Sequence, residues 1–179
     1  MSACLLLLTG ATRAFPQAAT LTEHRVVIPE RGEVPGYMVT LETNRFAFLP
    51  PPGWRVSCKP GAKCVVIISA DLTSSITVDF PEAEVSEKDV QQRATELVST
   101  RYPDAHVREA FACHTGLGEG VGFDAERKAA NKTRLSSRLV YVMHDRSAVE
   151  FSLTTPPSKF SECTTAFDNV VSSFRRPAR

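Results

Sequence analysis

The sequence predicts an α+β domain in which a largely antiparallel β-sheet is flanked by two main helices. Strand-like apolar runs fill much of residues 37–80 and 105–154, whereas residues 86–102 show helical spacing. A second helical stripe runs from Phe160 to Phe174, in a helix that begins at residues 155–158. Strands, a helix, further strands and a closing helix are the element order expected of a sheet that helices seal.

Size and composition are those of one ordinary globular domain. The chain has 179 residues, of which 42% are hydrophobic and 23% are charged. The 21 basic and 20 acidic residues are well mixed and give a net charge of +1. This balance argues against a nucleic-acid-binding surface, so we expect no nucleic-acid partner.

The amino terminus is typical of a targeting segment. An apolar run over residues 3–8 precedes small residues, which predicts a signal peptide at residues 1–14. The run is too short to span a bilayer, so we expect no transmembrane segment and an exported protein, periplasmic or secreted. Prolines and glycines predict a loosely ordered lead-in at 15–36, a single domain at 37–175 and a frayed tail at 176–179.

Residues 45–64 predict two strands around a rigid corner. Phe46 and Phe48 alternate with their neighbours, as in a strand that borders a core. The three prolines at 50–52 remove three backbone donors in succession, so the chain must leave its ladder before Trp54 opens the next strand. A Pro-Gly turn within residues 58–64 then predicts a hairpin.

The remaining strands follow from period-two alternation and turn residues. The run at 65–70 is continuously apolar, which predicts a central strand buried on both faces. Residues 129–132 are expected to form a hairpin tip. Further strands are predicted at residues 37–41, 76–80, 105–113, 118–127, 135–144 and 148–154.

Two helices complete the prediction. The first has a capping-box pattern at Ser86 and Asp89 and ends before Pro103. The second begins with prolines in its first turn. Its apolar stripe consists of Phe160, Cys163, Phe167, Val170, Val171 and Phe174.

Four cysteines remain after the signal segment, and an exported protein is expected to pair them. Three connectivities are possible. Cys58 with Cys64 is favoured because both flank a short turn, and this disulfide would contribute ~2 kcal/mol. Cys113 with Cys163 would close a longer loop and contribute ~4 kcal/mol. The alternative is that Cys163, on an apolar helix face, is a buried free thiol.

The order of elements, with the segments FAFLPPPGWRV, SEKDVQQRATELV and FDNVVSSF, resembles the Mog1/PsbP-like superfamily over residues 37–175. That group includes photosystem II extrinsic proteins, a Ran-binding protein and DcrB-like envelope proteins. The resemblance implies a sheet between helices and a binding or assembly role. It carries no catalytic residue and no cofactor to this chain.

The sequence shows no catalytic, cofactor or metal motif. The four histidines, His24, His106, His114 and His144, are scattered and lack metal-ligand spacing. Glycines at 116, 118, 120 and 122 do not fit a dinucleotide fingerprint, and they predict close packing along a strand instead.

A basic cluster surrounds the expected hairpin tip and is the candidate partner-binding patch. It consists of Arg127, Lys128, Lys132, Arg134 and Arg138. One interpretation is a solvated, edge-protecting hairpin, and the other is a surface that docks an acidic partner. The predicted function is a non-enzymatic exported binding or envelope-assembly module with a protein partner. The alternative is a small exported hydrolase or metal-dependent enzyme.

Overall fold

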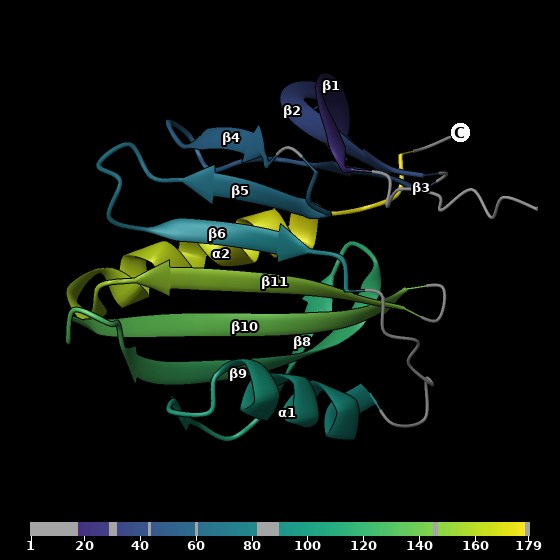
Figure 1. Cartoon of the computed structure of the whole chain (residues 1–179). Coiled ribbons are helices and arrows are strands. Elements are labelled where there is room, and N and C mark those ends of the chain that lie inside the picture. The colour runs from purple at the N-terminus through teal and green to yellow at the C-terminus, as the bar shows by residue number, and fades with distance from the viewer. Residues whose placement is uncertain are drawn as a thin grey trace, which may run out of the picture.

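The computed structural model describes residues 18–28, 32–42, 44–59, 61–81, 90–144 and 147–177. Within these ranges the chain forms a three-stranded and an eight-stranded sheet, and the strands of both pair in antiparallel fashion (Figure 1). The predicted α+β class with a largely antiparallel sheet is confirmed. The expected signal peptide, the helix cap at Ser86 and part of the turn before residue 147 lie outside the described residues.

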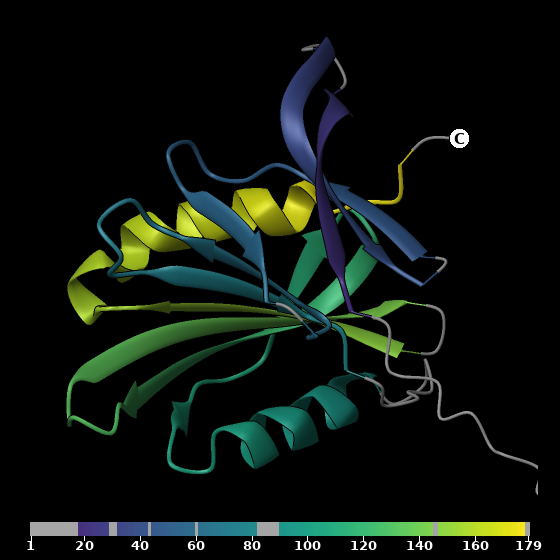
Figure 2. The same ribbon diagram turned by 45° about the horizontal axis from the view of Figure 1, so that its top comes forward.

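The small sheet corrects the expectation of a loose lead-in. Its strands are β1 (Thr20–Ile28), β2 (Gly32–Leu41) and β3 (Asn44–Phe48), in that order. β1 and the first half of β2 are largely exposed and lack a period-two apolar pattern, because their order comes from the β1–β2 ladder rather than from a buried face. The far end of the β1–β2 hairpin projects away from the large sheet (Figure 2), whereas at its base the Ala19 amide donates to the Ala62 carbonyl between β4 and β5 (3.1 Å).

The large sheet has the order β4-β5-β6-β11-β10-β9-β7, and β8 also pairs with β9. A bulge at residues 108–110 divides the single strand predicted at 105–113 into β7 and β8. The strands are β4 (Arg55–Cys58), β5 (Cys64–Ile68), β6 (Ser75–Asp79), β7 (His106–Val107), β8 (Phe111–Thr115), β9 (Gly118–Lys128), β10 (Arg134–His144) and β11 (Ser147–Thr155).

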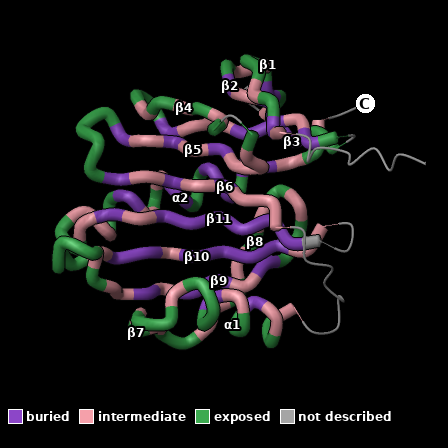
Figure 3. Tube along the Cα trace, in the orientation of Figure 1, coloured by how far each residue is buried: buried purple, intermediate pink, exposed green. Residues whose placement is uncertain are grey.

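β5 is not the central strand that its apolar sequence predicts. It lies next to the edge strand β4, and its residues alternate between buried and half-buried. The central strands are β10 and β11, which are buried over most of their length (Figure 3). The apolar residues of β5 that face away from α2 are therefore only half-covered.

Two helices cover opposite faces of the large sheet, as predicted. Figure 2 shows α2 (Phe160–Ser173) above the sheet and α1 (Val90–Arg101) below it. A 3-10 turn, η2 (Pro157–Lys159), carries Pro157 in its first turn and leads into α2. Within the described residues, neither helix has the length and apolarity needed to cross a membrane.

The main core lies between α2 and the large sheet, and Phe174 lies at the centre of this core. Phe174 is fully buried, and its ring lies 5.2 Å from Phe46, 5.8 Å from Phe48 and 5.0 Å from Phe151 between centroids. The predicted stripe of α2 points into this core. The core under α1 is smaller and consists of Ala94, Val98, Phe123, Leu139 and Tyr141.

The proline corner moves the chain from the small sheet to the large one. β3 ends at Phe48, and the next backbone amide, that of Leu49, donates to Ser173 Oγ at the end of α2 (3.0 Å). After the prolines, the Trp54 amide donates to the Pro51 carbonyl (3.1 Å) and β4 begins. The predicted corner is therefore the joint between the two sheets.

Candidate functional site

The basic hairpin end is the part of the predicted patch that the structure brings together. We use this name for Arg127, Lys128, Lys132 and Arg134, which lie at the adjoining ends of β9 and β10 and in the turn between them. Lys132 has a φ of 65°, a left-handed conformation that turns the chain at the tip.

A hollow of about 450 Å³ opens beside the basic hairpin end. Glu126 Oε1 accepts from Arg108 Nη2 (3.0 Å), while Glu126 Oε2 accepts from Arg134 Nη2 (3.3 Å). One carboxylate is thus shared between two guanidinium groups, so the positive charge here exceeds the negative charge. The lining residues are Asp104, His106, Glu126, Arg127, Lys128 and Arg134.

Arg138 does not belong to this surface and is a correction to the predicted patch. Its Nε and Nη2 lie 2.8 Å and 3.0 Å from the two Asp124 oxygens, and its Nη1 lies 3.4 Å from Asp168 of α2. The guanidinium also lies over the rings of Phe111 and Phe160. Hydrogen bonding to Asp124 raises the pKa of Arg138, which joins β10 to α2.

Arg127 faces the α1 side of the sheet. It lies opposite Leu135, whereas its neighbour Lys128 lies opposite Arg134, and adjacent strand residues point to opposite faces. The Arg127 guanidinium lies 5.7 Å from the centroid of the Tyr102 ring. The basic hairpin end therefore wraps around the end of the sheet rather than covering one face.

A row of polar residues crosses the large sheet beneath α1, and sequence reasoning did not find it. Register pairs Tyr141 with Glu150, Glu150 with Asp79, and Asp79 with Cys64. Arg101, at the end of α1, lies 2.9 Å from both Glu150 Oε1 and Asp79 Oδ2. We call these five residues the Arg101 row.

The Arg101 row contains a buried carboxylate, that of Glu150, whose pKa is shifted by burial and by the neighbouring charges. The Glu150 side chain is 3% exposed, and burial raises its pKa while the Arg101 charge opposes that shift. Burial also raises the pKa of Tyr141, and it raises the pKa of Cys64 to about 12 with help from Asp79. Since Arg101 bridges two carboxylates, the row fastens α1 to the sheet.

The four described cysteines are free thiols, so neither predicted disulfide is present. Cys58 lies opposite Val65, so the side chains of Cys58 and Val65 point to the same face of the sheet. Cys64 precedes Val65 on β5, and its side chain therefore points to the other face. The Cys163 thiol donates to Ser74 Oγ (3.4 Å) and is buried, as the alternative interpretation expected.

Cys113 lies opposite Gly120 of β9. A Cβ at Gly120 would lie 3.0 Å from the Cys113 Sγ, and the Asp168 charge acts on this thiol. The Cys163 Sγ instead hydrogen-bonds to Ser74 and Thr155, so the two thiols have different neighbours.

The glycine series packs closely, as predicted. A Cβ at Gly116 would lie 2.4 Å from the Phe174 carbonyl oxygen, and one at Gly122 would lie 2.3 Å from the Phe111 ring. Gly118 differs, since it has open space around it and a φ of 131° that serves the turn before β9.

The histidines remain separate in the fold. His144 Nε2 lies 2.9 Å from Arg176 Nη2, and its ring packs edge-on against Phe46. His106 lies opposite Glu126 in the sheet. Among the described residues there is no group of three or more His, Cys, Asp or Glu side chains placed to hold a metal ion.

Two further hollows were not foreseen. One, of about 360 Å³, lies between the first turn of α1 and strands β8 and β9. The other, of about 800 Å³, lies along the β1–β2 hairpin beside Tyr37 and Pro50. Their only sequence signal is the small size of Ala110, Ala112 and Gly36, because a hollow depends on which segments meet across it.

Comparison with known proteins supports the fold. No protein-family model matches the sequence, and no curated protein matches it. The structure is similar to that of the PsbP protein CyanoP from the cyanobacterium Synechocystis, with a TM-score of 0.58 and 14% identity, covering 98% of each chain.

Two other solved structures are similar. The Saccharomyces cerevisiae Ran-binding protein Mog1p has a TM-score of 0.54 and 13% identity, covering 88% of this chain and 96% of its own. A Bacteroides thetaiotaomicron protein has a TM-score of 0.54 and 16% identity, covering 75% of this chain and 46% of its own. The chain therefore has the Mog1/PsbP-like fold.

Proposed function

We propose that this protein is a non-enzymatic, exported binding module that takes up an acidic segment of a protein partner at the basic hairpin end. The observation that carries the proposal is the hollow beside that end, where Arg108 and Arg134 share one carboxylate, that of Glu126. A partner carboxylate would find cationic groups there that Glu126 does not neutralise. Binding is also what the name of the Ran-binding protein Mog1p, of the same fold, states for that protein.

The charges of the basic hairpin end suit recognition rather than catalysis. The Arg108 and Arg134 side chains are 60% and 73% exposed, so each ion pair there contributes only about 0.2–1 kcal/mol. Several such contacts together steer an acidic partner and weaken as salt screens them. The interaction is therefore expected to be fast and salt-sensitive.

The alternative of a hydrolase or metal-dependent enzyme is not favoured. The carboxylate of Glu150 is buried and ion-paired with Arg101, and it lines none of the three hollows described above. A general acid must reach a bound substrate within hydrogen-bond distance. Glu150 is placed to hold α1 rather than to meet a substrate.

A charge reversal tests the proposed surface. Replacing Lys128, Lys132 and Arg134 together by Glu is expected to lower partner recovery in cross-linking from the native cell at least tenfold, whereas raising the salt concentration should weaken wild-type binding. The matched control reverses exposed Arg55 and Lys59, which lie on and beside β4. Unchanged recovery with the triple variant would contradict the proposal.

Export is tested separately. The apolar run at residues 3–8 supports a cleaved signal, so the mature protein is expected to begin near residue 15. N-terminal sequencing of the protein from cell fractions measures this. A cytoplasmic protein that retains residues 1–14 would overturn the exported assignment and leave the binding surface to be judged on its own test.

A further inference from the structure

Strand β8 is a free edge of the large sheet. It pairs with β9 on one side, from Phe111 opposite Gly122 to Thr115 opposite Gly118. On its other side no strand pairs with it in the part of the chain that the structure describes. An unpaired strand edge presents a row of backbone donors and acceptors to another chain.

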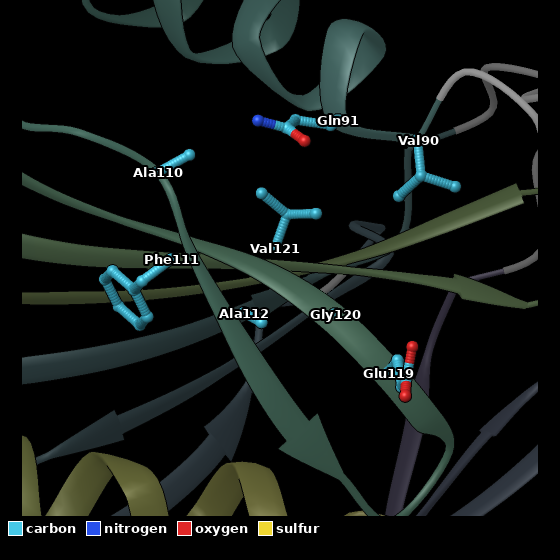
Figure 4. A pocket seen from close by; sticks show the side chains of 8 residues that line it. All are labelled: Val90, Gln91, Ala110, Phe111, Ala112, Glu119, Gly120 and Val121. Carbon is cyan, nitrogen blue, oxygen red and sulfur yellow. The ribbon is translucent and has the colours of Figure 1, made fainter.

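A hollow of about 360 Å³ lies over the face of β8 and β9 next to this edge. Its floor is formed by β8 and β9 and its wall by the first turn of α1. Figure 4 shows Val90 pointing down toward the strands, Gln91 running along the underside of the helix and Val121 pointing up from the strand, while Phe111 points away. The edge and the helix thus form the two sides of a groove.

Small side chains on the edge strand leave the hollow open. Ala112 is exposed and lies opposite Val121, so both point to the α1 face of the sheet. Ala110 precedes β8 and also lines the hollow. A side chain from a strand added beside β8 can therefore reach over the alanines into the space under Val90.

Glu119 gives the groove a charge. It lines the hollow, is exposed and forms no salt bridge within the described residues. Glu119 lies two residues before Val121 on β9, on the same face of the sheet, at a spacing of about 7 Å. The groove therefore offers an apolar site and, two strand residues away, a carboxylate that lies across β8 from the free edge, opposite His114.

We propose that the groove between β8 and α1 binds an extended segment of a partner polypeptide by β-strand addition. The segment pairs with the free edge of β8, an apolar side chain enters the hollow, and a Lys or Arg two residues away meets Glu119. Main-chain hydrogen bonds then supply affinity, and the hollow and the carboxylate select the sequence.

This surface is distinct from the basic hairpin end. The residues that line the two hollows do not overlap, and the two sites select opposite charges. Loss of acidic-partner binding in the charge-reversal experiment above therefore leaves the groove intact. The two proposals can therefore be refuted independently of each other.

The test uses a synthetic nine-residue peptide of alternating valine and threonine, with one lysine two positions from the central valine. Its matched control carries glutamate in place of the lysine. Titration into the full-length protein is expected to shift the amide resonances of residues 111–115 and 119–121, with roughly millimolar or tighter affinity. The glutamate peptide is expected to bind about fivefold more weakly.

Two variants complete the test. Ala112→Phe fills the hollow and is expected to weaken the lysine peptide at least tenfold, whereas the control Ala130→Phe, at an exposed alanine of the β9–β10 turn, leaves it unchanged. Glu119→Lys removes the preference for lysine, and Glu23→Lys on β1 does not. Absent shifts at millimolar peptide, shifts confined to other surfaces, or equal binding by Ala112→Phe would each overturn the proposal.

Discussion

Replacing Arg101 by Met tests whether the Arg101 row fastens α1 to the sheet. The guanidinium lies 2.9 Å from Glu150 Oε1 and 2.9 Å from Asp79 Oδ2, and methionine keeps part of its aliphatic length but no charge. The variant leaves Glu150 buried without its cation. Two apolar residues, Ala94 and Val98, are the buried residues of α1, so little else compensates.

The magnitude follows from burial. Breaking a fully buried ion pair costs about 3–5 kcal/mol. Here the Glu150 side chain is 3% exposed but that of Arg101 is 45% exposed, so water screens part of the pair and we expect a loss of about 2–3 kcal/mol near neutral pH. For a domain of this size, that corresponds to a fall in Tm of about 5–10 °C.

Urea unfolding followed by circular dichroism measures the loss. Arg101→Met combined with Glu150→Gln should recover much of it, because the amide carries no charge to leave unpaired. Arg93→Met, which removes an exposed pair with Glu96 on the same helix, is the control and is expected to change stability far less than Arg101→Met. Equal effects of Arg101→Met and Arg93→Met, or no recovery in the double variant, would refute the role of the row.

Three further results are expected. Burial raises the folded-state pKa of Glu150 above its unfolded value of about 4.3, so its contribution to stability is fully present below about pH 4.3 and is lost as pH rises through the folded pKa. In urea titrations, Glu150→Gln should therefore flatten this part of the pH dependence of the free energy of unfolding. An unchanged pH dependence in the variant would contradict the raised pKa. Gly116→Ala should destabilise by about 2 kcal/mol or more and exceed Gly122→Ala, since a Cβ at Gly116 meets backbone whereas one at Gly122 meets a ring that can rotate; the reverse order in thermal melts would count against this packing. Native alkylation at about pH 8, followed by mass spectrometry, should be slow at the half-buried Cys64 and Cys113, whose pKa values are raised to about 12 and about 11. Rapid labelling of either thiol would contradict its raised pKa.

Elements with strong local periodicity were predictable. The stripe of α2 from Cys163 to Phe174 is buried as its 3.6-residue spacing requires, and the hairpin from β4 to β5 forms where the Pro-Gly turn places it. β1 was not predicted because most of its residues are exposed, so its sequence shows no periodic apolar pattern. Its order comes from backbone pairing with β2, which leaves no mark on the choice of side chains.

The candidate sites were predictable only in part. The charges around the β9–β10 tip are visible in the sequence. The sequence does not show that Arg138 is excluded from this surface by its ion pairs with Asp124 of β9 and Asp168 of α2. The expected disulfide between Cys58 and Cys64 is absent because Cys58 lies opposite Val65, one residue from Cys64. This register puts the two cysteines on opposite faces of the sheet.

The sequence by itself indicated both helices and most of the strands, although not β1, because turn chemistry and periodicity are local properties. Only the tertiary structure decided which polar side chains meet. Tyr141, Glu150, Asp79 and Cys64 come from four strands and form a row only because the register of three ladders aligns them. The groove beside β8 likewise exists because α1 crosses near an edge strand that alanines leave open. Such contacts join distant segments, and local sequence does not specify their register.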